Sequence, residues 1–233
     1  MGNMGAARIA SASDTPPRVV GVDVGGNRKG FHAVLLEGDE VTCTLQNSNA
    51  REVANWCREM RADVVAIDAP CRWSVTGRAR TAERELARLG IHTFATPSRE
   101  RAVKIAFHSW MLNGECLYEC LAPEYPKYGG EASGGRVSIE TFPQAVACAL
   151  AGRIVSAKAK ATLRRGLLAE LRIDTSKLSN IDLVDAALCA IAGQRFLAGT
   201  ACLFGDAKEG HIVVPRGIPQ HLKREKRPPP SGS

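Results

Sequence analysis

The sequence has no long hydrophobic run, and no apolar stretch approaches the roughly 20 residues that a helix needs to span a bilayer. Residues 1–17 contain no apolar segment of the kind found in secretory signals. None of the eight cysteines forms a CxxC pair, and most lie within apolar stretches, so neither a zinc site nor a disulfide framework is predicted. These absences predict a cytoplasmic protein with no membrane partner.

Internal repeats and long linkers are also missing, so we predict a single domain over residues 18–218. The two ends, 1–17 and 219–233, are rich in Ser, Pro, Gly or charge and are predicted to be disordered tails. The formal net charge of the chain is +7, and the second tail is basic. This charge is compatible with a polyanionic partner such as a nucleic acid, without specifying its type.

Hydrophobic periodicity predicts a mixed α/β protein with the element order β-β-β-α-β-α-β-α. The segments 18–25, 30–46, 63–70 and 136–143 supply five strands, because a turn at EGDE divides the second segment into a hairpin. We therefore expect a five-stranded sheet, in which crossover units add parallel strands to an antiparallel meander. The predicted helices cover 49–62, 80–90, 98–122, 143–152, 159–171 and 180–198, and a small extra strand is expected at 210–215.

Carboxylates stand where the predicted strands end. Asp23, Asp68 and Glu140 each follow a buried strand, and the carboxyl ends of parallel strands meet at one edge of a sheet. Asp182 and Asp185 share one face of the last predicted helix, because they are three residues apart. Oxygen ligands grouped without Cys or His suit Mg²⁺ or Mn²⁺ rather than zinc.

Other residues near these acids are candidates for substrate binding. Lys29 and Arg80 lie in segments next to the acids and can meet phosphate oxygens. His92 is expected to line the cleft. Trp110 can stack on a base, although the helical spacing of apolar residues in 98–122 is more typical of a core.

Six short motifs follow one another along the chain, namely GVDVGGNRKGFHAV, AIDAP, RTAERELARLGIHTFATPS, ETFP, DLVDAALCA and GHIVVP. Together they resemble a predicted-nuclease family known as domain of unknown function 429, in the RNase H-like (Holliday-junction resolvase-like) superfamily. The resemblance runs from about Val19 to Pro215. It implies an RNase H-like fold and a metal-dependent nuclease that hydrolyses phosphodiester bonds. By this analogy the catalytic, metal-binding acids are Asp23, Asp68, Glu140 and Asp185, with Asp182 as the adjacent metal candidate.

The mechanism implied by this resemblance uses two divalent ions about 4 Å apart. Asp23 is the expected bridging ligand, Asp185 and Glu140 hold one ion each, and Asp68 ligates an ion or orients water. The RNase H pattern also places an acid on its first helix. Segment 49–62 carries no acidic motif, so Glu140 is the predicted substitute.

Two alternatives remain open at this stage. GVDVGG is similar to a phosphate-binding loop of actin-like and sugar-kinase ATPases, but that fold needs a second such subdomain and a second glycine-rich loop, which the sequence lacks. The other alternative is a non-catalytic RNase H-like binding module. ATP binding would favour the first, and metal binding would count against the second.

Overall fold

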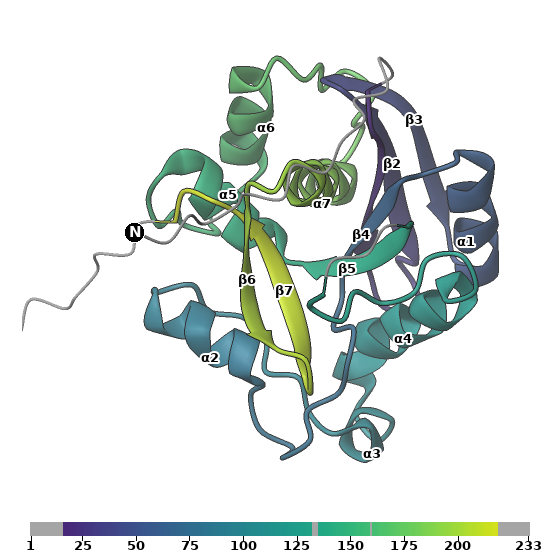
Figure 1. The fold of residues 1–233 in the computed structure, drawn as a ribbon, viewed down its shortest axis with the longest axis vertical. Coiled ribbons are helices and arrows are strands. Elements are labelled where there is room, and N and C mark those ends of the chain that lie inside the picture. Colours follow the sequence, from purple (N-terminus) through teal and green to yellow (C-terminus); the bar gives the residue numbers. More distant parts are fainter. Residues whose placement is uncertain (1–15, 132–134, 159, 219–233) are drawn as a thin grey trace, which may run out of the picture.

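A computed structural model describes residues 16–131, 135–158 and 160–218 of the chain. This part of the chain forms one mixed sheet with helices on both of its faces (Figure 1). None of its helices combines the length and the apolar character needed to cross a membrane. The predicted tails lie outside the described residues, except for residues 16 and 17.

The sheet consists of β1 (Arg18–Val24), β2 (Phe31–Glu37), β3 (Glu40–Asn47), β4 (Val64–Asp68), β5 (Val137–Thr141), β6 (Ala201–Asp206) and β7 (Gly210–Pro215). The helices are α1 (Ala50–Glu59), α2 (Thr81–Arg88), α3 (Arg99–Ala102), the 3-10 turn η1 (Ala106–His108), α4 (Ser109–Leu121), α5 (Pro143–Ala151), α6 (Lys160–Glu170) and α7 (Ile181–Leu197).

The strand order is β3-β2-β1-β4-β5-β7-β6. β1 pairs antiparallel with β2 and parallel with β4, and β5 adds to β4 in the same direction. A three-stranded meander with two parallel strands added beside its first strand is the arrangement expected of the RNase H-like fold. The predicted fold class is therefore confirmed by the strand order.

The described sheet has seven strands rather than the predicted five. β7 is the extra strand expected at 210–215, and it pairs parallel with β5. β6 was missed, and it pairs antiparallel with β7. Nearly all of its side chains are partly buried, so this strand lacks the alternation of apolar and polar residues by which a strand is usually predicted. Gly205, with a φ of 111°, also interrupts it.

The predicted helix over 98–122 is also corrected. The chain leaves the helical conformation between α3 and η1, and α4 then runs through Gly114 without a break. A Cβ atom at Gly114 would lie 2.4 Å from the Cβ atom of Ala69. The glycine therefore marks a close approach of α4 to the end of β4 rather than the end of a helix.

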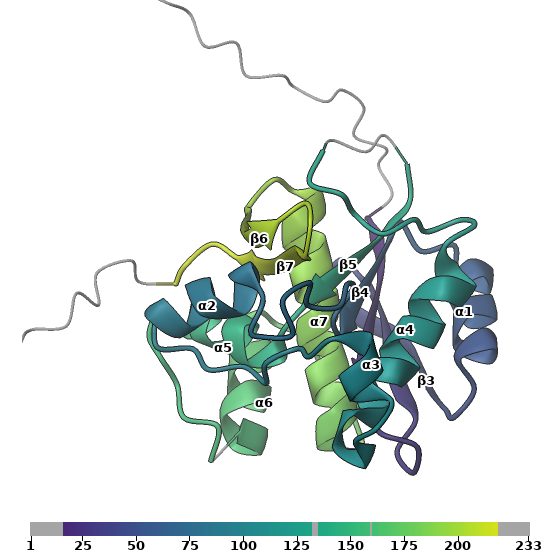
Figure 2. The ribbon, with the colours of Figure 1, turned by 90° about the horizontal axis from the view of Figure 1, so that it is seen from below.

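Alternating side chains of the strands enter two separate cores. Val19 of β1 and Val64 of β4 pack toward α5, α6 and α7, whereas Val20 and Val65 pack toward α1 and α4. Figure 2 shows α1 and α4 on one side of the molecule and α5 and α6 on the other. Residues with the parity of Val19, including Asp23, therefore face α7.

Close packing sets the position of α7 against β1. A Cβ atom at Gly21 would lie 2.0 Å from the carbonyl oxygen of Ala186, so only glycine permits this contact. Near the other end of the helix, a Cβ atom at Gly193 would lie 2.5 Å from Val19 Cγ1. The helix begins at its N-cap, Asn180, whose side chain accepts a hydrogen bond from the Leu183 N–H. Its first turn consequently lies beside the end of β1.

Candidate active site

Asp23 and Asp68 end two neighbouring parallel strands in the same register. Residues paired in this way lie about 4.8 Å apart along the hydrogen-bonding direction and point to the same face of the sheet. Both acids therefore face α7, as Gly21 does two residues earlier in β1. Neither carboxylate accepts a hydrogen bond from another described residue.

The first turn of α7 brings two further acids to this edge. Asp182 is held by Lys29, whose Nζ lies 3.0 Å from each of its carboxylate oxygens. Asp185 is buried and contacts two cations, the Arg164 guanidinium and the Lys160 Nζ, the latter at 3.3 Å. Asp182 and Asp185 thus have cationic partners, whereas Asp23 and Asp68 have none at salt-bridge distance among the residues that the structure describes.

Burial and mutual repulsion disfavour the charged forms of the strand acids. Burial is the largest cause that raises the pKa of Asp23, to about 7, and the negative charges of Asp185 and Asp182 add to it. The pKa of Asp68 is also raised well above its usual range by burial, followed by the charges of Asp23 and Asp185. A cluster of carboxylates that repel one another is stabilised when a cation binds among them.

Glu140, at the end of β5, is already paired. Its carboxylate receives two hydrogen bonds from the Arg80 guanidinium and one, at 2.8 Å, from the Cys71 N–H. Arg80 is only 1% exposed and also contacts Glu83 at 2.9 Å. Two residues predicted for different roles, a metal ligand and a phosphate-binding cation, therefore bind one another in the interior.

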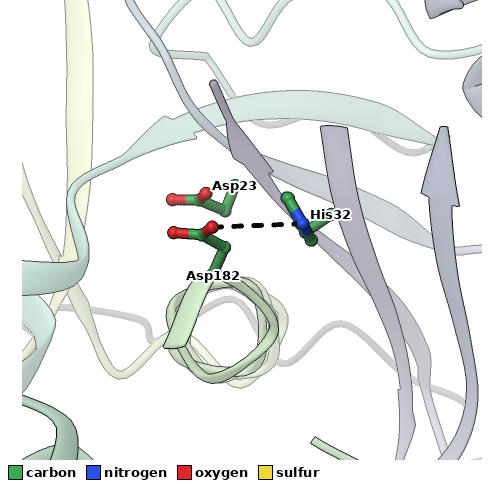
Figure 3. A group of neighbouring side chains, drawn as sticks. All are labelled: Asp23, His32 and Asp182. Carbon is green, nitrogen blue, oxygen red and sulfur yellow. Dashed lines mark ion pairs between the residues drawn. The ribbon is translucent and has the colours of Figure 1, made fainter. Parts of the chain in front are cut away.

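A histidine completes the group around Asp23. His32 stands opposite Asp23 in the β1–β2 register, and ligand atoms of Asp23, His32 and Asp182 all lie within 4.8 Å of one another (Figure 3). The His32 Nε2 is 4.0 Å from an oxygen of Asp182. Burial lowers the pKa of His32, which favours the neutral imidazole that can bind a metal ion.

These acids open into a cleft of about 400 Å³. Its walls include the loop after β1, the first turn of α7 and the aromatic side chains of Phe94, Phe107 and Trp110. The cleft lies at the carboxyl ends of the parallel strands, the edge of the sheet where the sequence predicted a site.

A family model described as "Protein of unknown function (DUF429)" matches residues 21–209. The chain belongs to the DUF429 family. A search of curated proteins finds no match for this DUF429 protein. Among solved structures, "Thermus thermophilus RuvC structure" matches with 21% sequence identity, covering 78% of this chain and 97% of that chain, at a TM-score of 0.42. That likeness is distant.

The structure of the DUF429 protein brings all five predicted acids around one cleft, namely Asp23, Asp68, Glu140, Asp182 and Asp185, and Arg80 lines it as well. Lys29 lies at the same cleft, with a side chain that is 62% exposed. His92 is exposed and does not line the cleft, although the following residues, Thr93 and Phe94, do.

His32 is the residue of this group that the sequence analysis of the DUF429 protein missed. The feature that could have identified His32 is the register of the first hairpin. The turn closes with a hydrogen bond from the Gly25 N–H to the Gly30 carbonyl, which pairs Val24 with Phe31 and therefore Asp23 with His32. Counting outward from this turn would have placed a histidine beside the first acid.

Proposed function

We propose that this protein is a divalent-metal-dependent nuclease that hydrolyses phosphodiester bonds of a nucleic acid. The observation that carries the proposal is the pair of strand-end acids, Asp23 and Asp68. They lie in register, face one cleft, have raised pKa values and accept no hydrogen bond from the described residues. Partly buried carboxylates in this state are typical of a site that a metal ion stabilises.

The donor set fits Mg²⁺ or Mn²⁺. Asp23, Asp68 and Asp182 would supply carboxylate oxygens, and the His32 imidazole would add one nitrogen. Because imidazole is a softer ligand than a carboxylate, its presence favours Mn²⁺ over Mg²⁺. Bound divalent ions would supply Lewis acidity toward a phosphoryl oxygen and would lower the pKa of a water molecule.

Asp185 remains in the proposed ligand set, but Glu140 takes a different role. Asp185 raises the pKa of both Asp23 and Asp68, and one of its partners, Lys160, has a side chain that is 41% exposed. Glu140 is proposed as a positioning residue, since both of its oxygens serve Arg80 and Cys71.

Cations of this chain are placed to receive the substrate. Lys29 lies on the turn after β1 and Lys160 at the start of α6, and both line the cleft beside the acids. Their ammonium groups would donate hydrogen bonds to phosphate oxygens flanking the reacting bond. They would also offset the repulsion between the acidic cluster and the anionic backbone of the substrate.

A cleavage panel with metal ions tests the proposal. The full-length protein is incubated with Mg²⁺ or Mn²⁺ and with single-stranded, duplex and branched DNA and RNA. We expect cleavage of at least one substrate, and Asp23→Asn should reduce it by about 10³-fold or more. Asp39→Asn is the matched control, because Asp39 is exposed and does not line the cleft.

Thermal unfolding is the second readout. Millimolar Mn²⁺ should raise the melting temperature of the unsubstituted chain but not that of Asp23→Asn, since an ion that binds only the folded state stabilises it. No cleavage and no thermal shift would overturn the proposal. Saturable ATP binding without cleavage would favour the kinase-like alternative, and a thermal shift without cleavage would favour a non-catalytic module.

A further inference from the structure

Three aromatic side chains, Phe94, Phe107 and Trp110, line the cleft together with the acids, and we call them the aromatic rim. The ring centroids of Phe94 and Phe107 are 5.3 Å apart, and those of Phe94 and Trp110 are 6.4 Å apart, both in edge-to-face geometry. Phe107 in η1 and Trp110 at the start of α4 are three residues apart, and the fold brings Phe94, from the loop after α2, beside them.

Two of the three rings are exposed, whereas Trp110 is partly buried and packs against the core. Phe94 is 63% exposed and Phe107 is 56% exposed, whereas the other four phenylalanines of the chain are all buried or partly buried. Leaving such large apolar side chains in water forgoes the stabilisation that burial would give. Aromatic side chains that stay exposed at a cleft are typical of a binding surface.

Charge around the rim indicates the nature of its ligand. Arg101 on α3 and Lys104 just after it are exposed, and both lie within six residues of Phe107. Lys29 and Lys160 line the same cleft. Aromatic rings bordered by cations are the combination that binds single-stranded nucleic acids, where bases stack on rings while the backbone meets positive charge.

We propose that the aromatic rim stacks an unpaired base of the nucleic acid next to the bond held at the acids. The ligand is then single-stranded, or is unpaired at this position, because the faces of bases in a continuous duplex are covered by their neighbours. This inference rests on the proposed nuclease function for the identity of its ligand. It concerns binding rather than cleavage, which allows the two to be tested separately.

Binding without cleavage is measured in a chelator by fluorescence anisotropy, with labelled single-stranded oligonucleotides and the matching duplexes. Phe94→Ala with Phe107→Ala should weaken single-strand binding by about 5- to 150-fold for each base that no longer stacks, and leave duplex binding unchanged. Leu203→Ala is the matched control, because Leu203 is 42% exposed on β6 and does not line the cleft. Both proteins should keep the melting temperature of the unsubstituted chain.

A base analogue reports stacking directly. The fluorescence of 2-aminopurine in the single strand should be quenched on binding to the unsubstituted chain, and the quenching should disappear in the double variant and persist in Phe107→Trp. An oligonucleotide with an abasic residue at the stacking position should bind the unsubstituted chain and the double variant equally.

Three results would overturn the inference. One is an unchanged single-strand affinity in the double variant, which would assign the rim to binding of another protein. The others are equal losses of affinity for single strands and duplexes, and no binding by the unsubstituted chain with chelator or with Mn²⁺. Normal single-strand binding through the rim, with no cleavage under any condition, would instead overturn the nuclease proposal and leave the inference standing.

Discussion

Each acid in the cleft is set apart by its immediate partner. Asp182 faces an exposed lysine, Asp185 a buried arginine, and Glu140 the almost fully buried Arg80, whereas Asp23 and Asp68 accept no hydrogen bond from the described residues. Carboxylates of the same residue type at the same edge of the sheet therefore contribute differently to the free energy of unfolding. Those with cationic partners stabilise the fold as they are, and those without one destabilise it until a proton or a metal ion arrives.

The raised pKa of Asp23 predicts how stability depends on pH in the absence of metal. The pKa is about 7 in the folded chain and about 3.8 for an unperturbed Asp, so between these values the folded state holds a proton that the unfolded state lacks. The free energy of unfolding contributed by this group therefore falls as pH rises from about 4 to about 7, and is constant above that range.

Asp23→Asn removes this contribution. Its melting temperature, measured in chelator, should exceed that of the unsubstituted chain by an amount that grows from pH 4.5 to pH 7.5. Asp39→Asn should show no such growth, because Asp39 is exposed. A difference that stays constant across this range would mean that burial and the neighbouring charges do not act on Asp23 as described.

Glu140 and Asp68 should respond in opposite ways to loss of charge. Glu140→Gln leaves the buried Arg80 guanidinium without its main counter-charge, which should cost about 3 kcal/mol of stability, while the rise in melting temperature with Mn²⁺ persists. Asp68→Asn relieves repulsion, so the fold should stay intact or gain stability while the Mn²⁺ effect is lost. Thermal unfolding with and without Mn²⁺ measures both. An unchanged stability with a lost Mn²⁺ effect in Glu140→Gln would restore Glu140 to the ligand set.

At the scale of elements, the site depends on the packing of α7 against β1. Two residues of a strand advance about 6.6 Å and four residues of a helix advance about 6 Å. Gly21 and Asp23 on β1 therefore match Ala186 and Asp182 on α7, which places the acid of the helix beside the acid of the strand. The close approach at Gly21 sets both the distance between α7 and β1 and the distance between Asp182 and Asp23.

Gly21→Ala tests this packing. The added methyl group would meet the Ala186 carbonyl oxygen at 2.0 Å, so α7 must shift, at a cost of about 3 kcal/mol. The folded fraction should also lose the Mn²⁺ stabilisation, because Asp182 moves away from Asp23. Gly166→Ala in α6 is the control, since its Cβ atom meets nothing within 4 Å, and it should be neutral or stabilising by up to about 1 kcal/mol. Equal melting temperatures for the two variants would contradict this account.

At the scale of the whole molecule, the features that could be predicted from the sequence are those that depend on local pattern and on strand order. Asp23 and Asp68 follow apolar runs, and parallel strands bring such ends together, so their convergence needed no tertiary information. The pairing of Arg80 with Glu140 joins residues 60 positions apart. No periodicity in the sequence indicates which buried acid pairs with a buried arginine. Arg80 and Glu140 were therefore predicted to have separate roles, and those roles stay predictions. The exposure of Phe107 was not predicted for a related reason. Its spacing from other apolar residues in 98–122 fits the buried face of one continuous helix, but the chain leaves the helix before η1.

The ion pair between Lys29 and Asp182 joins the turn after β1 to the first turn of α7. In the proposed site this ammonium group is a built-in competitor, since a divalent ion must take over oxygens that Lys29 holds. The affinity measured for the ion is then an exchange constant, which contains the free energy of releasing the lysine as well as that of coordination. Once released, the lysine stands at the cleft mouth with its charge uncompensated. Occupancy by the metal would thereby switch on an anion-binding group, so that metal and nucleic acid bind with positive cooperativity.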